Sequence, residues 1–66
     1  SAPVVTQKAI WIADDEGQVY VLDPANGQLT QRVGLDGSAL AAPPIQHNQT
    51  VLMVTRKGLV RAMRAP

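Results

Sequence analysis

The chain has no cysteine and no phenylalanine, and its only aromatic side chains are Trp11 and Tyr20. Without cysteine there can be no disulfide bond, and no cluster of histidines and carboxylates in the sequence indicates a structural metal ion. A chain of 66 residues buries only about 60% of the surface that it exposes when unfolded, so it is marginally stable without such supports. Because its apolar content of 45% is ordinary for a folded protein, we expect it to pack against more protein.

Long hydrophobic runs are also missing. No apolar run approaches the roughly 18 to 20 residues that a membrane-spanning helix needs. The opening residues, SAPVVTQ, lack the basic segment and apolar core of a signal peptide. We therefore expect any export signal of the parent protein to lie outside this sequence.

An excess of charge of one sign is absent too, because the net charge is +1. The sequence therefore gives no indication of a nucleic acid or an anionic membrane as partner. The acidic residues all lie between Asp14 and Asp36. Four of the six basic residues gather near the end: Arg56, Lys57, Arg61 and Arg64. A solvated edge strand accounts for this basic cluster, and contact with an acidic partner is the alternative.

The sequence does contain a repeat with a period of 41 residues, so that Pro3 falls on Pro44. The two copies align without a gap, and Gly17 falls on Gly58. Apolar residues coincide as well: Ile10, Trp11, Ile12 and Ala13 fall on Val51, Leu52, Met53 and Val54, and Val19, Val21 and Leu22 fall on Val60, Ala62 and Met63. The repeat predicts one complete unit, residues 1–41, and a partial second unit, residues 42–66.

Each unit consists of short apolar runs separated by turns. In the segment DDEG, Gly17 can adopt the positive φ that closes a type I turn with a bulge, and Gly58 repeats this device. In the segment DPANG, Asp23 can bond its own turn backbone, Pro24 pre-sets φ, and Gly27 accepts a positive φ. The pattern predicts four strands per complete unit, joined as antiparallel hairpins.

The apolar runs 10–13 (IWIA) and 51–54 (VLMV) are continuous rather than alternating. Strands of this kind are usually buried on both faces, and runs of about four residues are too short for helices. Four-stranded antiparallel units that repeat at about 40 to 45 residues are the blades of a β-propeller. The predicted fold class is all-β, with about one and a half blades from a larger propeller.

One and a half blades cannot close a ring, so the outer faces of these runs would meet water and the edge strands would be open. If the chain exists alone, we expect copies to self-associate or to pair strands. The residues expected between blades are Ile10, Trp11, Ile12, Val19, Val21, Leu22, Val51, Leu52, Met53 and Val54.

The segment APVV and the later stretch IWIADDEGQVYVLDPANG resemble the repeats of quinoprotein-type propellers, called PQQ-like repeats. Those repeats combine an SPVV-like start, a VYVG-like strand, a DG turn and an LYALD-like strand. More specifically, the chain resembles the carboxy-terminal end of the BamB family, the propeller lipoproteins of the outer-membrane β-barrel assembly machinery of Gram-negative bacteria. The segment VLMVTRKGLVRAMR, residues 51–64, is similar to the last strand pair of that family.

This resemblance implies an eight-bladed propeller in the periplasm, with a lipid anchor on the outer membrane at an amino terminus outside this sequence. It implies a scaffold without catalysis or cofactor. Such a scaffold binds the periplasmic repeats of a BamA-like central assembly protein and can support strand addition at exposed edges. It assigns no protein-binding residue in this chain, because the best-known contact loops of the family lie in earlier blades.

A fragment of a PQQ-dependent periplasmic dehydrogenase is the enzymatic alternative, and a generic PQQ-like repeat protein with another ligand is a third. Blades of the dehydrogenases carry the docking pattern A-x-D-x-x-T-G-x-x-x-W. The matching positions here are Val21, Asp23, Asn26, Gly27 and Gln31. The aspartate and the glycine are kept, but Gln31 replaces the tryptophan, which argues against the enzyme.

The acidic turn could be interpreted as paired carboxylates or as a calcium loop. However, Asp14, Asp15 and Glu16 lie at a solvated hairpin tip, which offers no burial to shift a pKa. Their spacing also lacks the alternate-residue oxygens of a calcium loop. A turn is the favoured interpretation.

The remaining polar candidates also favour structural roles. We interpret QHNQ as a polar surface turn that contains His47, with no nearby cysteine, histidine or carboxylate. Ser1, Ser38 and Thr50 lack the sequence surroundings of a nucleophile. Trp11 lies in a different strand from the docking position and is expected in the core. No catalytic, cofactor-binding or metal site is predicted.

Overall fold

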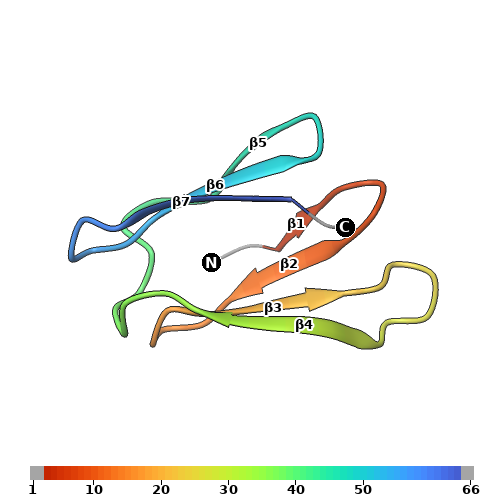
Figure 1. Ribbon diagram of the computed structural model, residues 1–66, viewed down its shortest axis with the longest axis horizontal. Coiled ribbons are helices and arrows are strands. Elements are labelled where there is room, and N and C mark those ends of the chain that lie inside the picture. The colour runs from red at the N-terminus through yellow and green to blue at the C-terminus, as the bar shows by residue number, and fades with distance from the viewer. Residues whose placement is uncertain (1–2, 65–66) are drawn as a thin grey trace.

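The computed structural model of the chain describes residues 3–64. Within this range the chain folds into strands and turns, without a helix (Figure 1). The strands are β1 (Val4–Val5), β2 (Ile10–Ala13), β3 (Gln18–Leu22), β4 (Leu29–Gly34), β5 (Ile45–His47), β6 (Thr50–Val54) and β7 (Val60–Arg64).

The strands form two antiparallel sheets that follow the order of the chain. The first sheet has the order β1-β2-β3-β4, and the second has the order β5-β6-β7. Residues that align in the repeat occupy equivalent places, since Val4 pairs with Trp11 as Ile45 pairs with Leu52. The predicted all-β fold of antiparallel, blade-like units is thus confirmed. The predicted boundary at residue 41 falls in the connection between the sheets and stays a prediction.

The pairing register gives each sheet two faces, because side chains alternate along a strand and antiparallel partners share a face. In the first sheet, the Trp11 face carries Val4, Trp11, Ala13, Val19 and Val21, and the Tyr20 face carries Val5, Ile10, Ile12, Tyr20 and Leu22. In the second sheet, the Met53 face carries Gln46, Val51, Met53, Arg61 and Met63. The Leu52 face carries Ile45, His47, Thr50, Leu52, Val54, Val60, Ala62 and Arg64.

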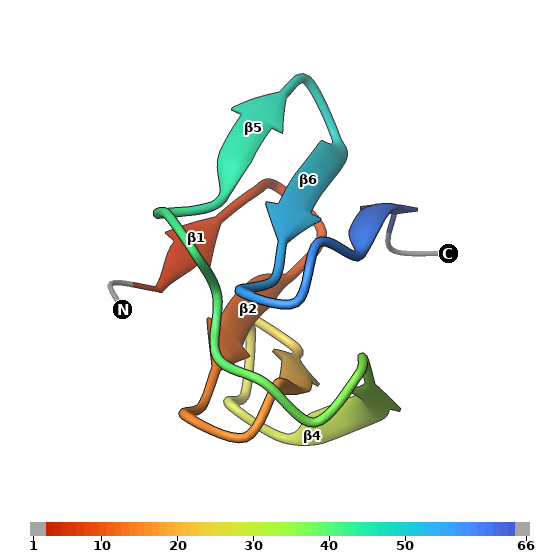
Figure 2. The ribbon, with the colours of Figure 1, turned by 90° about the vertical axis from the view of Figure 1, so that its left-hand side faces the viewer.

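The core lies between the Trp11 face and the Met53 face, and Figure 2 shows β5 and β6 above β2 and β4. Its fully buried apolar side chains are Ala9, Trp11, Val19, Val21, Val51 and Met53. No layer within residues 3–64 covers the opposite faces, which leaves these residues only partly buried: Ile10, Ile12, Leu22, Leu52 and Val54. The continuous apolar runs predict burial on both sides, but two sheets can bury only one face of each other.

The turns before β3 and β7 are built alike and align in the repeat. Gly17 has a φ of 75° and Gly58 a φ of 99°, values in the left-handed region that favours glycine. Their N–H groups donate to the carbonyl oxygens of Asp14 (3.3 Å) and Thr55 (3.0 Å). Their surroundings differ, because a Cβ on Gly17 would clash with the carbonyl oxygen of Ser38, whereas one on Gly58 would contact nothing.

The connection between the sheets, residues 35–44, is bonded to both of these turns. The N–H of Leu35 donates to the carbonyl oxygen of Gly17 at 2.9 Å. The hydroxyl of Thr55 donates to the carboxylate of Asp36 at 2.5 Å. These bonds join the two sheets at one end of the molecule, on the left in Figure 1.

The turn between β3 and β4 is ordered by Asp23. Its carboxylate accepts the N–H of Ala25 at 2.8 Å, and its carbonyl oxygen accepts the N–H of Gly27 at 2.7 Å. Gly27 has a φ of 71°. Asn26 adds a further bond, because its side-chain oxygen accepts the N–H of Gln28 at 3.0 Å.

His47 is the last residue of β5 and does not lie in a turn, contrary to the interpretation of QHNQ as a turn. Asn48 and Gln49 alone form the turn, because His47 already pairs with Thr50. Asn48 has a φ of 55°, a conformation that asparagine tolerates better than most residues. This tolerance allows the shorter turn, and His47 is left as an exposed strand residue.

Candidate functional site

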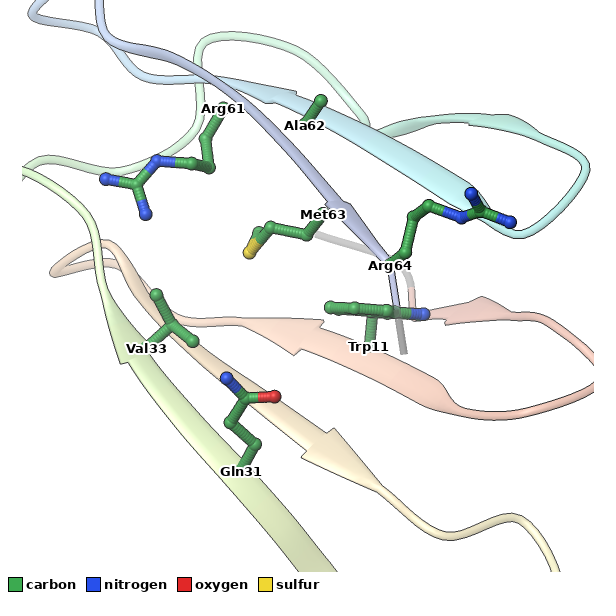
Figure 3. Close-up of a pocket in the computed structure, with 7 residues that line it drawn as sticks. All are labelled: Trp11, Gln31, Val33, Arg61, Ala62, Met63 and Arg64. Atoms are coloured by element: carbon green, nitrogen blue, oxygen red, sulfur yellow. The ribbon is translucent and has the colours of Figure 1, made fainter. Parts of the chain in front are cut away.

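A groove with a volume of about 270 Å³ lies between the two sheets beside β7. Figure 3 shows Trp11 and Met63 near its middle, and Arg61 and Arg64 at its two ends. The lining residues come from β2, β4 and β7: Trp11, Gln31, Val33, Arg61, Ala62, Met63 and Arg64.

Strand register brings the walls of the groove together. Val21 is the antiparallel partner of both Trp11 and Gln31, so these two side chains share one face of the first sheet. On β7, Arg61 and Met63 alternate with exposed residues and face the first sheet. Segments that are far apart in the chain therefore meet in one groove.

Gln31 stands where the dehydrogenase docking pattern has tryptophan, and it lies in this groove together with Trp11. Trp11 does come from a different strand, as the sequence indicates, but it reaches the same space from β2. The groove thus contains the indole ring of Trp11, and it has the amide of Gln31 where the docking pattern would place a second aromatic ring.

The polar groups of the groove are mainly hydrogen-bond donors. Trp11 is only 2% exposed, and its Nε1 has no hydrogen-bond partner among the described residues. Arg61 adds a positive charge that faces the first sheet, and Arg64 lies at the rim with its side chain pointing away from Trp11 in Figure 3. None of the lining residues is acidic. A buried N–H without an acceptor costs about 1 to 3 kcal/mol. Because Nε1 is itself buried, an oxygen acceptor could reach it only after a shift of the residues around it.

The groove follows β7, whose outer edge is open in the part of the chain that the structure describes. Over that range β7 pairs with β6 alone, so its other side presents backbone N–H and C=O groups. An added strand gains affinity from main-chain hydrogen bonds and specificity from pockets for its side chains. The edge and the groove together fit an extended peptide that carries carboxylate groups.

The acidic turn uses its carboxylate for its own structure. Asp14 accepts the N–H groups of Gln18 and Glu16, both at 2.9 Å, and the hydroxyl of Tyr20 at 3.1 Å. The bond from Gln18 contributes most to holding the pKa of Asp14 below its ordinary value. The bond to Asp14 in turn raises the pKa of Tyr20. Asp14 is thus an ionised acceptor and a poor general acid.

A second network, which the sequence does not reveal, joins the two sheets. Asp36 accepts the hydroxyl of Ser38 at 2.6 Å and the hydroxyl of Thr55, and Thr55 accepts the N–H of Leu59 at 3.0 Å. Thr55 is the repeat counterpart of Asp14, and both accept an N–H four residues onward. Alignment of the repeats could have found this shared turn role, but not the bond to Asp36.

Acid should weaken the fold through Asp36. The hydroxyls of Ser38 and Thr55 hold the pKa of Asp36 below the ordinary aspartate value of 3.8. Asp36 therefore binds a proton more readily in the unfolded chain than in the folded chain, and its ionised form stabilises the fold. This stabilisation is fully present above pH 3.8 and is lost as the pH falls toward the lowered pKa of Asp36. Urea titrations at several pH values should show stability falling in this range.

The Asp36→Asn variant should be less stable at neutral pH, and its stability should depend less on acid than that of the unchanged chain. The matched control is Asp15→Asn, which makes the same charge change at an exposed turn position. Equal acid dependence in the Asp36 variant and the unchanged chain would contradict the assigned role of Asp36.

The other polar candidates are not brought together. Ser38 lies in the Asp36 network, Thr50 begins β6, and Ser1 is outside the described residues. Within residues 3–64, no group of three histidine or carboxylate side chains could hold a metal ion. Over the same range, no helix is long and apolar enough to cross a membrane.

Comparison with known proteins gives three matches across nearly the whole chain. All three are named outer membrane protein assembly factor BamB. The protein of Bordetella pertussis is 34% identical over 98% of this chain, that of Aliivibrio fischeri 31% over 97%, and that of Burkholderia pseudomallei 32% over 94%. This chain is similar to a segment of BamB.

The predicted relationship to BamB is thereby confirmed. The match to the Bordetella BamB covers 65 residues and so includes both sheets and the groove. The chain spans only 16 to 17% of the length of these BamB proteins. A scan against models of known protein families finds no match. The predicted place at the carboxy-terminal end of BamB stays a prediction.

Proposed function

We propose that this chain is a non-catalytic scaffold segment that acts in the assembly of outer-membrane proteins. The observation that carries the proposal is the similarity to three BamB proteins over 94 to 98% of the chain. The side chains support it as well, because the groove contains no nucleophile and no carboxylate for acid–base chemistry. The acidic turn uses its best-placed carboxylate for internal hydrogen bonds.

The proposed partner is the central, BamA-like assembly protein, bound through its periplasmic repeats. The proposed location is the periplasm, with the parent protein lipid-anchored to the outer membrane outside this chain. The contact in this segment would be the groove and the open edge of β7. Arg61 and Arg64 would bind carboxylates, and the indole N–H of Trp11 would donate to an oxygen of the added strand after a shift of the residues around it.

The test measures binding of the chain to the purified periplasmic repeats of the BamA-like protein. We expect saturable binding that weakens about tenfold or more in the double variant Arg61→Gln, Arg64→Gln, because charge pairs orient and strengthen such contacts. The matched control, Arg56→Gln with Lys57→Gln, removes the same charge from an exposed turn outside the groove and should bind normally.

Two results would overturn the proposal. Equal loss of binding in both double variants would indicate only a general effect of charge. Absence of binding, together with saturable binding of pyrroloquinoline quinone in the presence of calcium, would favour the dehydrogenase fragment instead.

A further inference from the structure

The turn between β3 and β4, on the right in Figure 1, contains the dipeptide Asn26-Gly27, and both residues are exposed. Asparagine is among the chemically labile residues of proteins. The backbone nitrogen of the next residue can attack its side-chain amide carbon, Cγ. Glycine favours this attack more than any other residue, because it has no Cβ in the way and its backbone rotates freely.

The surroundings of this turn leave room for the attack and assist it. A Cβ added to Gly27 would meet no atom within 4 Å, so no neighbouring segment confines the turn on that side. The N–H of Gln28 donates to the side-chain oxygen of Asn26 at 3.0 Å. Negative charge develops on this oxygen when a nitrogen attacks Cγ, and a hydrogen-bond donor that is already in place stabilises that charge.

One hydrogen bond opposes the attack. The N–H of Gly27 donates to the carbonyl oxygen of Asp23 at 2.7 Å, and the nitrogen must leave this bond before it reaches Cγ. The bond lies in an exposed turn, and such segments open locally at much lower cost than global unfolding. The fold therefore slows the reaction without preventing it.

We propose that Asn26 is a site of spontaneous deamidation in the folded chain, with the nitrogen of Gly27 as nucleophile and water as the second reactant. A bond forms between this nitrogen and Cγ of Asn26, and the bond from Cγ to Nδ2 breaks. The proton of the Gly27 N–H passes through solvent to the leaving nitrogen, which departs as ammonia. The product is a five-membered succinimide ring.

Water then opens this ring at one of its two carbonyl carbons. Opening on one side gives aspartate, and opening on the other gives isoaspartate, in which the main chain runs through Cγ. One water is consumed and one ammonia released overall, with no oxidation or reduction. The modification goes beyond the proposed scaffold function and does not depend on it, because Asn26 does not line the groove.

Two other positions of the chain serve as internal controls. Asn48 is also exposed, but the side chain of Gln49 hinders attack by the nitrogen that follows. Asp36 precedes Gly37, which has a φ of 84° and open space around it. The carboxylate of Asp36 is held ionised by the hydroxyls of Ser38 and Thr55, and an ionised carboxylate is a poor target for a nucleophile.

Isoaspartate would alter the turn itself, because it adds one atom to the main chain between β3 and β4. Two backbone bonds span this turn: Asp23 donates to the carbonyl oxygen of Gln28 at 2.8 Å, and Gly27 donates to that of Asp23. The longer loop cannot keep both bonds in their present geometry. The converted chain should therefore unfold at a lower urea concentration than the fresh chain.

The experiment incubates the folded chain at mildly alkaline pH and digests samples with trypsin, which cuts after lysine and arginine. The peptide of residues 9–32 then carries Asn26, and that of residues 33–56 carries both controls. Mass spectrometry and chromatography against synthetic standards should show aspartate and isoaspartate forms of the first peptide. They should accumulate at least about tenfold faster than any change in the second peptide, because of the glycine.

Two further samples test the assignment. The matched variant Asn26→Gln keeps an amide at the same exposed position but would have to close a larger ring, so its peptide should stay unchanged. The unchanged chain unfolded in urea should convert no more than about tenfold faster than the folded chain, because the turn opens at low cost.

Three results would overturn the proposal. The first is an Asn26 that converts in urea but not in the folded chain, which would show that the bonds of the turn protect it. The second is equal conversion of the two peptides, which would remove the role of the turn. The third is aspartate without isoaspartate, which would indicate direct hydrolysis of the amide by water.

Discussion

Replacement of Gly17 by alanine should destabilise the fold by about 3 kcal/mol, from strain of about 1 to 2 kcal/mol in the left-handed conformation and a steric term of similar size. Gly17 has a φ of 75°, which disfavours any side chain. The added Cβ would also clash with the carbonyl oxygen of Ser38 in the connection between the sheets. The turn cannot move away freely, because Leu35 donates to the carbonyl oxygen of Gly17.

Urea unfolding of Gly17→Ala and Gly58→Ala, compared with the unchanged chain, checks this expectation. Gly58 is the repeat counterpart, with a φ of 99° and no atom near the added Cβ. Its alanine variant should lose only the conformational term, about 1 to 2 kcal/mol. Equal losses of stability in the two variants would show that Gly17 is required only for the turn conformation and not for its close contact with Ser38.

Much of the fold follows from the sequence because its determinants are local. The strands and turns depend on short apolar runs, on glycines that accept positive φ, and on Asp23, which bonds a backbone N–H two residues away. The repeat then predicts that the two units are alike. Features that depend on contacts between distant segments are not encoded in this way. The bond between Asp36 and Thr55, 19 residues apart, is one example.

The candidate site was less predictable, for a physical reason. Arg61 and Arg64 appear in the sequence as part of a basic cluster for which a solvated edge is explanation enough. Their position on a groove depends on the packing of β7 against the first sheet. The sequence singles out Gln31 only because it stands where the docking pattern has tryptophan. What takes its place in the groove, the indole of Trp11, depends on strand register.

Replacement of Trp11 by alanine should remove a large part of the stability of the chain. Trp11 is 2% exposed and belongs to the core between the sheets. Removal of a buried tryptophan costs about 3 to 5 kcal/mol. A domain of this size has a total stability of about 3 to 10 kcal/mol, at about 0.05 to 0.15 kcal/mol per residue. In circular dichroism, the strand signal of the purified variant should therefore be lost at a much lower urea concentration than that of the unchanged chain, or already without urea.

Leu52→Ala is the matched control, because Leu52 is the repeat counterpart of Trp11 on the uncovered face. Leu52 is only partly buried, so its truncation should cost about 1 kcal/mol. A Trp11→Ala variant as stable as Leu52→Ala would show that the contact between the sheets does not hold the fold together.

Trp11→Phe separates the role of the ring from the role of its N–H group. Phenylalanine keeps most of the buried apolar surface, and the lost Nε1 has no partner among the described residues. The fold should therefore lose less than about 1.5 kcal/mol. If Nε1 donates to the proposed partner strand, binding should weaken about threefold to tenfold, the net effect of one hydrogen bond. A folded Trp11→Phe variant that binds the periplasmic repeats normally would mean that the groove packs the two sheets together without contacting the partner through its indole.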